Sequence, residues 1–373
     1  MFVVVYWGTE TLDESVRTED FDYELPLDLI AQTPCAQRDQ SRLLVLNRAT
    51  AARTHHAFAD LLQFLRPGDI IVLNDSKVLP ARLRGLNTRT EGEFEILLLE
   101  ENARNDWWAM IRPGKRARLG TEIRFKDRHG AITSFKAIVT EANAEGHRRL
   151  RWEGTDDVLQ HLDELGEVPL PPYIKREGNR SLEEDWARYQ TVYGQNRGSM
   201  AAPTAGLHFT ARLLNEIRQM GVQICTVTLH VGLGTFAPVK TSVIAEHPMH
   251  EEAFSVPAET ATAIAEGKAC GRRVIAVGTT TTRVLETVAR ENAGRIVPVR
   301  GRTRIFIYPP QVFQVVDALV TNFHLPCSTL LMLVSAFAAP GCKNGRDLIL
   351  DTYAEAIRER YRFFSYGDAM LLL

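Results

Sequence analysis

Three histidines and one aspartate stand where expected strands and helices meet, and their side chains suit proton transfer. His208 lies just before an expected helix, His230 closes an expected strand, and His324 follows another strand. Asp75 follows the apolar run 70–74, so it can be an exposed carboxylate at the same place, although aspartate is also a common turn former. Imidazoles and carboxylates are the usual groups for general acid–base catalysis. Each histidine alone is more often structural, but their joint placement favours a reaction site.

The histidines and cysteines do not form a metal-binding pattern. No two of the ten histidines are spaced i, i+4, and His247 and His250 have a proline between them. The five cysteines are far apart and form no C-x-x-C pair, which favours free thiols in a reducing compartment. Segment 232–237 lacks the third glycine of a dinucleotide fingerprint, and the P-loop motif is missing. We therefore expect no metal, no nicotinamide cofactor and no P-loop chemistry.

Four consecutive threonines, Thr279 to Thr282, join an expected strand at 274–278 to an expected helix at 283–292. The N-terminus of a helix presents free backbone N–H groups and a partial positive charge, which favour an anion or a polar ligand. A plain threonine N-cap is the alternative, but four threonines exceed what a cap requires.

The elements that position these residues alternate between strands and helices. Apolar periodicity predicts a helix-like segment at 59–65, helices at 211–220, 258–267, 283–292 and 347–359, and strands at 70–74, 223–230, 274–278 and 318–322. Thr210 is the expected N-cap of the helix at 211–220. Because open α/β sheets bind ligands beside the carboxyl ends of their strands, we expect His208, His230 and His324 on one rim.

The pattern changes between residues 78 and 166, where short alternating runs predict an inserted antiparallel sheet or small barrel. The proline-rich stretch 168–173 cannot continue a strand ladder and is expected to lead out of the insertion. We predict an α/β fold with a mixed, largely parallel sheet and covering helices at 19–78 and 168–373, and a β-barrel at 79–167. Residues 1–18 fit neither a signal peptide nor a membrane span and are expected to be a disordered extension.

The charge balance limits how the protein can bind a nucleic acid. With 44 basic and 46 acidic residues the net charge is −2, so contacts with RNA must come from local basic clusters. The candidates are Arg112, Lys115, Arg116 and Arg118, with a second cluster at Arg295, Arg300, Arg302 and Arg304. Trp107, Trp108 and Tyr173 are the candidate stacking groups. Such basic runs are usually solvated faces, and that alternative stays open.

The apolar run 330–339 is about half as long as a membrane span requires, and it is expected to be a buried core helix. We therefore expect a cytoplasmic protein without a membrane partner, and a monomer rather than an obligate oligomer.

Nine segments match a known pattern: FDYELP at 21–26, LIAQTP at 29–34, RDQSR at 38–42, LNDS at 73–76, AAPTAGLHFT at 201–210, HVGLGTF at 230–236, VGTT at 277–280, TNFHLP at 321–326 and YRFFSYGD at 361–368. Through them the chain resembles the S-adenosylmethionine:tRNA ribosyltransferase-isomerases of queuosine synthesis, from about Asp20 to the C-terminus. Ten consecutive matching residues at 201–210 make coincidence implausible.

The resemblance implies a larger α/β domain with an inserted β-barrel. It also implies a reaction in which the ribosyl part of S-adenosylmethionine moves onto 7-aminomethyl-7-deazaguanine at the tRNA wobble position, giving epoxyqueuosine, adenine and methionine. S-adenosylmethionine is then a consumed substrate, so no cofactor is expected, and the partner is a tRNA that carries the precursor base.

The implied chemistry needs a base beside the sulfonium and an acid for the departing adenine. His208 or His230 is the candidate for these proton transfers, and Asp75 for holding the substrate amine or a ribose hydroxyl, with Asp317 or Asp368 as weaker alternatives. Thr279 to Thr282 are assigned to the methionine carboxylate or to a tRNA phosphate. The expected substrate-binding residues are Asn74, Ala202, Pro203, Thr204, Gly206, Gly232, Gly234, Thr235, Thr279, Thr280, Asn322 and His324.

Four residues depart from the pattern of the family. Arg302 and Arg304 stand where an aromatic and an acidic residue are expected, Pro310 replaces a glycine, and Cys327 replaces a polar residue. They put substrate affinity at that edge in doubt. Two rival functions remain: a paralogue that uses S-adenosylmethionine on another substrate, and a non-catalytic RNA-binding protein.

Overall fold

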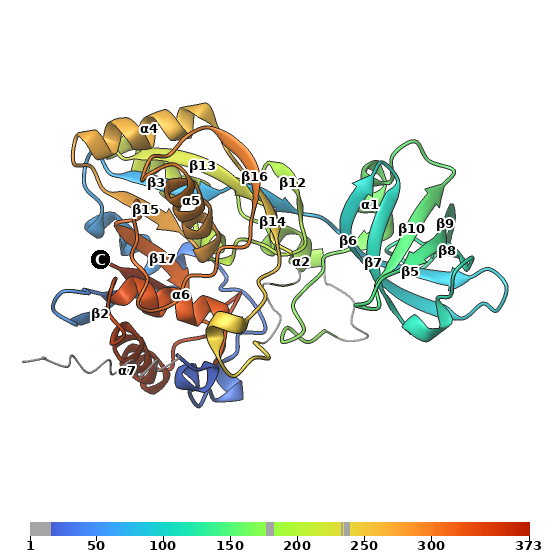
Figure 1. Cartoon of the computed structure of the whole chain (residues 1–373), viewed down its shortest axis with the longest axis horizontal. Coiled ribbons are helices and arrows are strands. Elements are labelled where there is room, and N and C mark those ends of the chain that lie inside the picture. The colour runs from blue at the N-terminus through green and yellow to red at the C-terminus, as the bar shows by residue number, and fades with distance from the viewer. Residues whose placement is uncertain (1–15, 177–182, 233, 235–238) are drawn as a thin grey trace, which may run out of the picture.

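The computed structural model describes residues 16–176, 183–232, 234 and 239–373, and it consists of two bodies that lie side by side (Figure 1). The larger body is built on a nine-stranded mixed sheet, and the smaller body is a closed antiparallel barrel. The α/β fold with an inserted barrel, predicted from the sequence, is confirmed.

The large sheet has four parallel strands at its centre and antiparallel strands at its edges. Its order is β16 (Val299–Thr303), β14 (Glu252–Val256), β13 (Gln223–Leu229), β3 (Ile70–Asn74), β15 (Val274–Val277), β17 (Ala318–Asn322), β18 (Ala369–Leu372), β1 (Arg42–Leu46) and β2 (Arg53–Ala57). The parallel strands are β13, β3, β15 and β17, whose carboxyl ends therefore meet at one rim.

Helices cover both faces of this sheet. Ile70 and Val72 of β3 pack on one face with α4 (Ala258–Ala269), α5 (Thr279–Glu291), α6 (Thr329–Ala338) and α7 (Gly345–Arg358). Ile71 and Leu73 pack on the other face with α3 (Ala211–Gln219) and the 3₁₀ segment η4 (Phe58–Phe64). This alternation is what a strand buried on both faces requires.

The barrel closes because β5 pairs with both β6 and β8. Its strands, in order around the barrel, are β5 (Arg82–Asn87), β6 (Glu93–Ala103), β7 (Asp106–Arg112), β10 (Arg148–Glu153), β9 (Ile132–Ala142) and β8 (Glu122–Lys126). Helix α1 (Leu162–Leu165) and strand β11 (Gly166–Glu167) lead back toward the α/β body, where β4 (Ser76–Val78) pairs with β12 (Asn196–Ser199).

Several details differ from the sequence-based prediction. Helix α5 begins at Thr279 rather than at 283, so all four threonines lie in its first turns. The described chain is already ordered at Thr18, whose backbone N–H donates to Ser242 O at 2.9 Å, and residues 1–15 of the expected extension lie outside the described residues. Thr210 caps α3 as predicted, because its hydroxyl accepts from Leu213 N. Among the described helices, none combines the length and apolarity needed to cross a bilayer.

Candidate active site

Asn74, the last residue of β3, ties the ends of three parallel strands together. Its side chain accepts from Leu229 N at 3.0 Å and donates to Leu229 O at 3.0 Å, which joins β3 to β13. It also lies 3.3 Å from Thr280 Oγ1, in the first turn of the helix that follows β15. Asn74 therefore positions the rim rather than standing free to bind a substrate.

His230 lies at the end of β13 and opens toward the barrel. Its Nδ1 is buried and has no hydrogen-bond partner among the described residues. The ring packs directly over Gly198, where an added Cβ would lie 2.6 Å from Nδ1 and where φ is +151°. Burial lowers the pKa of His230, and the negative charge of Asp75 opposes part of that shift. The ring is thus a neutral imidazole with one uncommitted nitrogen.

Asp75 is buried, which corrects the expectation of an exposed carboxylate. Its Oδ1 accepts from Thr228 Oγ1 at 2.7 Å and from Asn196 Nδ2 at 3.0 Å. Because β4 continues from Asp75 and pairs with β12, the aspartate is enclosed between two strands. It influences His230 through its charge.

His208, for which a role in proton transfer is predicted, has hydrogen-bond partners on both ring nitrogens. Asn322 Nδ2 donates to its Nε2 at 3.1 Å, so Nδ1 carries the proton and donates to Ser41 Oγ at 2.7 Å. Its ring stacks on Phe58, and burial lowers its pKa to about 3. Both ring nitrogens are occupied and the imidazole stays neutral.

His324 is also enclosed, so it does not reach the substrate side of the rim as expected. Its ring Nε2 lies 2.8 Å from Thr321 Oγ1. Its backbone N–H donates to Tyr353 OH, and its backbone carbonyl accepts from Tyr23 OH. Burial lowers its pKa to about 3. These contacts hold the turn after β17.

The two weaker aspartate candidates are structural as well. Asp317 precedes β17, so it lies at the opposite edge of the sheet, where it pairs with Lys268 at 3.0 Å and accepts from Val274 N. Asp368 is buried and accepts from the backbone N–H groups of Arg42 and Arg362.

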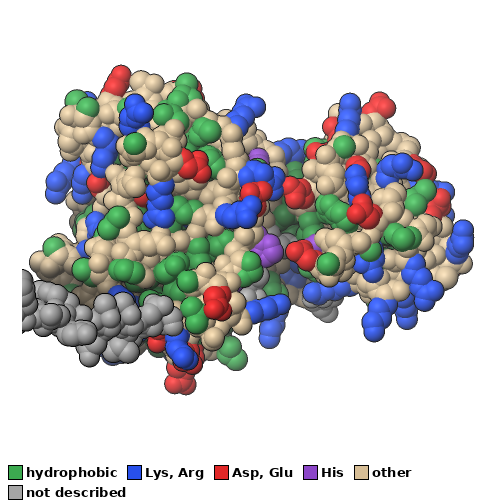
Figure 2. Space-filling model, viewed as in Figure 1, with side chains coloured by type: hydrophobic (Ala, Val, Ile, Leu, Met, Phe, Trp, Pro, Cys, Tyr) green, Lys and Arg blue, Asp and Glu red, His purple; other side chains and the backbone are tan. Residues whose placement is uncertain are grey.

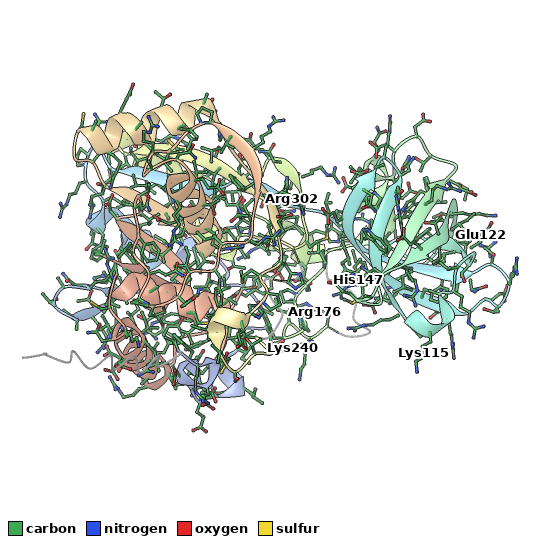
Figure 3. The ribbon with its side chains drawn as sticks, viewed as in Figure 1. Lys115, Glu122, His147, Arg176, Lys240 and Arg302 are labelled. Carbon is green, nitrogen blue, oxygen red and sulfur yellow. The ribbon has the colours of Figure 1, made fainter. Side chains whose placement is uncertain are left out.

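A cleft of about 1040 Å³ lies beside the rim, between the two bodies. From the α/β side it is lined by His230, Gly232, Gly234, Arg197 and Arg302, and from the barrel by Trp108, Met110 and His147. Figure 2 shows histidine side chains at this hollow, and Figure 3 places Arg302 and Lys240 on one side of it and His147 on the other. The cleft is wide enough for a nucleotide and a second ligand.

A narrower pocket branches from the cleft at the N-terminus of α5. Thr280 and Arg283 line it, and Gly234, His250 and Glu252 are shared with the cleft. Arg283 is buried, donates through Nη1 to Glu252 and leaves Nη2 without a partner among the described residues. No side chain caps α5, whose N-cap Gly278 has φ of 91°. Free N–H groups, a hydroxyl and a guanidinium thus converge where a carboxylate could bind.

The four threonines at the start of α5 differ in what their side chains contact. Thr281 and Thr282 turn their hydroxyls back onto Val277 O and Gly278 O, at 2.7 and 3.2 Å, whereas Thr280 faces the pocket. Thr279 is buried at the start of the helix.

Segment 201–210 is largely buried and has a supporting role in the site. Ala202 is buried in a small core, and Thr204 begins the 3₁₀ turn η8 (Thr204–His208) after Pro203. An added Cβ at Gly206 would lie 2.0 Å from Tyr193 OH, so that position has no room for a side chain. Thr235 lies outside the described residues.

The residues predicted to contact RNA also differ in how exposed they are. Trp107 is buried inside the barrel, and the hydroxyl of Tyr173 forms a hydrogen bond with Ser365 Oγ. Trp108 is partly exposed and lines the cleft. The basic residues of the first cluster, Arg112, Lys115, Arg116 and Arg118, are exposed, and Figure 3 shows Lys115 at the lower end of the barrel, away from the cleft. Among the described residues, no group of three or more His, Cys, Asp or Glu side chains could hold a metal ion.

Comparisons with known proteins agree with this architecture. A sequence model of the family described as "queuosine biosynthesis protein" matches residues 18–372. The chain belongs to this family. The resemblance drawn from the nine segments, and the enzyme class it implied, are therefore confirmed.

Relatives in this queuosine biosynthesis family cover nearly the whole chain. Proteins named S-adenosylmethionine:tRNA ribosyltransferase-isomerase are 49% identical in Desulforamulus reducens and 50% identical in Staphylococcus epidermidis, each over 96% of this chain and 100% of the relative. The crystal structure of the S-adenosylmethionine tRNA ribosyltransferase of Thermotoga maritima is 39% identical, covers 95% of this chain and 100% of its own, and has a TM-score of 0.54.

Of the four departures from the family pattern, Arg302 lines the cleft. Arg302 pairs with Glu251 at 2.7 Å and, across the cleft, with Glu100 of the barrel at 3.0 Å. Arg304 pairs with Glu251 at 3.2 Å. Cys327 has a positive φ of 54° and donates its backbone N–H to Phe21 O. Nothing in the structure explains the change at Pro310.

Sequence reasoning missed Glu252, Arg283, Asn196 and Gly198. Glu252 lies on β14, which apolar periodicity did not predict, and Arg283 looked like an ordinary residue inside a helix. They are 31 residues apart, so no local spacing links them. The glycine in segment 196–199 was the one available signal, because an isolated glycine in a strand indicates close approach.

Proposed function

We propose that this chain transfers and isomerises the ribosyl part of S-adenosylmethionine onto 7-aminomethyl-7-deazaguanine at the wobble position of tRNA. The products are epoxyqueuosine in the tRNA, adenine and methionine. The observation that carries the proposal is the cleft between barrel and sheet rim, which brings the imidazole of His230, a polar pocket at the N-terminus of α5 and a partly exposed tryptophan to one place.

The methionine part of S-adenosylmethionine is assigned to the pocket at the N-terminus of α5. Its carboxylate would meet Thr280, the free N–H groups of the first turn and Nη2 of Arg283. The pairing of Arg283 with Glu252 fixes the guanidinium while leaving that nitrogen unused. The ribosyl group then extends toward His230, because Gly234, His250 and Glu252 line both spaces.

His230 is assigned the proton transfers at the ribosyl carbon beside the sulfonium or at the departing adenine. A neutral imidazole can accept a proton, and the nearby charge of Asp75 stabilises the imidazolium that results. The precursor amine loses an N–H proton and forms a C–N bond to the ribosyl unit, which also forms a ring-closing C–C bond and the C–O bond of the epoxide. The glycosidic bond, the carbon–sulfur bond, a furanose C–O bond and one C–H bond beside the sulfonium break, and adenine leaves with one of the two protons so freed. Methionine departs as a neutral thioether, and one proton is released overall.

The tRNA is assigned to the barrel side of the cleft. Trp108 offers a face on which a base of an unpaired loop could stack, and proteins read single-stranded RNA largely in this way. Arg112, Lys115, Arg116 and Arg118 remain candidates for backbone contacts farther along the tRNA. S-adenosylmethionine is consumed as a substrate, so the proposal includes no cofactor, and it places a monomer in the cytoplasm.

Adenine release with different acceptors tests the proposal against its rivals. The protein is incubated with S-adenosylmethionine and either precursor-bearing or unmodified tRNA, and adenine and the modified nucleoside are measured by mass. We expect release only with precursor-bearing tRNA, in step with epoxyqueuosine. Release with a different acceptor would indicate a paralogue with another substrate, and tRNA binding without any release would indicate an RNA-binding protein.

A further inference from the structure

Three arginines surround a second pocket at the same rim, away from the cleft. Arg38, Arg188 and Arg362 line it together with Cys35 and His208; we call it the arginine pocket. Arg188 is the last residue of α2 (Glu183–Arg188), whose position appears in Figure 1. The proposed reaction uses none of these arginines.

Backbone carbonyls hold two of these guanidinium groups in place. Arg38 donates to Leu207 O at 3.0 Å and to Ala187 O at 2.7 Å, and Arg188 donates to Cys35 O and Ala36 O. Carbonyl groups orient a guanidinium without neutralising it, so the positive charge stays in the pocket.

The carboxylates nearby balance only part of this charge. Glu184 lies 3.7 Å from Arg188 and is mostly exposed, and Asp368 lies 3.5 Å from Arg362 while also accepting from two backbone N–H groups. Arg38 makes no ion pair within the described chain, and the buried Nε of Arg188 has no partner there. Burial and the charge of Arg188 lower the pKa of Arg38, which reflects this crowding.

We infer that the arginine pocket binds a backbone phosphate of the tRNA substrate, away from the reacting nucleotide. Arginine forks match phosphate oxygens, and cations without partners at a rim attract a phosphodiester. The arginine pocket and the cleft have no lining residue in common, so they are separate sites. An RNA strand whose reactive base enters the cleft could reach it. The inference rests on tRNA being the substrate.

Arg188→Gln tests the assignment, with Arg358→Gln as the matched control because Arg358 lies at the exposed end of α7. We expect the KM for tRNA to rise about tenfold in Arg188→Gln, with the KM for S-adenosylmethionine and kcat within about twofold. The slope of log KM against the logarithm of the salt concentration should become shallower by about one, as expected for the loss of one phosphate contact. Equal behaviour of the two variants, or a rise confined to S-adenosylmethionine, would overturn the inference.

A measurement on the unmodified protein covers the case in which Arg188→Gln does not fold. Cys35 lies in the pocket and is partly exposed, so its alkylation reports occupancy, with exposed Cys270 and Cys342 as internal references. We expect precursor-bearing tRNA to slow alkylation of Cys35 alone. An unchanged rate at saturating tRNA, or protection by inorganic phosphate but not by tRNA, contradicts the inference. If tRNA protects Cys35 but no adenine is released, the inference of a phosphate site is supported and the proposed reaction is contradicted.

Discussion

At the scale of single residues, His230 and His208 show how surroundings decide the chemistry of one side-chain type. The ring of His208 has partners on both nitrogens, whereas the Nδ1 of His230 has none among the described residues. A proton acceptor needs a free lone pair within reach of substrate. Of the two, only His230 lines the cleft, although its unpartnered Nδ1 is itself buried against Gly198.

The buried neutral histidines predict a loss of stability in acid. The pKa of His208 is about 3 in the folded protein and about 6.5 unfolded, so the unfolded state binds more protons between these values. The free energy of unfolding should therefore fall as pH drops below about 6.5, by up to about 1.4 kcal/mol per pH unit for this histidine.

Denaturant titrations from pH 7.5 to 5 on the wild type and on His208→Gln measure this effect. Glutamine keeps a donor and an acceptor but does not titrate, so the variant should lose less stability over that range. Identical pH slopes for the two proteins would show that His208 titrates normally.

The sequence located the ends of the strands but not the partners of each side chain. His208, His230 and His324 all follow from strand and helix positions, and all three lie near the rim. Which of them is enclosed depends on Ser41, Asn322 and Tyr353, which approach from distant segments. Periodicity along the chain holds no information about such contacts.

At the scale of elements, the N-terminus of α5 and the strand β12 carry the site. Thr280 and Thr281 are neighbours in one helical turn, yet Thr280 lines the pocket while its hydroxyl accepts from Asn74 Nδ2 at 3.3 Å, and the hydroxyl of Thr281 donates to Val277 O. Gly198 lets the backbone of β12 lie against the ring of His230. Both features come from backbone geometry.

Thr280→Val should weaken binding of S-adenosylmethionine, with Thr281→Val as a control in the same turn. Loss of a hydroxyl that contacts a carboxylate predicts a rise in the KM for S-adenosylmethionine of about tenfold, corresponding to about 1.4 kcal/mol. Initial-rate kinetics at several salt concentrations check it. A rise in the KM for tRNA with a shallower salt slope would instead assign Thr280 to a phosphate.

Gly198→Ala should impair catalysis without unfolding the protein. The new Cβ would lie 2.6 Å from His230 Nδ1, so the ring must move, and the backbone there has φ of +151°. We expect kcat to fall about a hundredfold, because a small displacement of a catalytic group is costly. Thermal unfolding separates this from global damage: unchanged kcat with a lowered Tm would contradict the placement of His230 in the site.

The elements themselves were predictable to different degrees. Strand β3 is a continuous apolar run, and α3 and α5 have strong apolar periods, so their existence followed from the sequence, whereas α4 is only weakly amphipathic. Strand β14 is short and begins with a buried glutamate, and the edge strand β16 is partly exposed and rich in arginine, so they carry no clear strand pattern. They matter nonetheless, because β14 carries Glu252.

At the scale of the whole molecule, the barrel and the α/β body are joined by apolar packing, in which Met200 enters the core of the barrel, and by several exposed polar contacts. Arg302 pairs with Glu100 at 3.0 Å, Arg197 pairs with Asp163 at 2.7 Å, and Arg128 lies over the ring of Trp186. Exposed ion pairs contribute at most about 1 kcal/mol each, and salt screens them. A bound tRNA could therefore replace these exposed contacts, whereas the packing of Met200 in the core of the barrel is buried.

Glu100→Gln should alter the arrangement of the two bodies more than their stability. We expect Tm to change by less than about 2 °C, as for other exposed pairs, while small-angle scattering shows a larger radius of gyration. High salt should produce the same expansion in the wild type. An unchanged scattering profile in both cases would mean that other contacts hold the cleft at its observed width.

The central claim is that His230 carries out proton transfer in the interdomain cleft, and single-turnover adenine release by His230→Ala tests it most directly. Saturating S-adenosylmethionine and precursor-bearing tRNA remove any effect on binding, and His129→Ala, on the barrel, serves as the control. We predict that His230→Ala releases adenine at least about a hundredfold more slowly while still binding tRNA, as expected for loss of a general acid–base group. A rate within about threefold of the wild type would contradict the account.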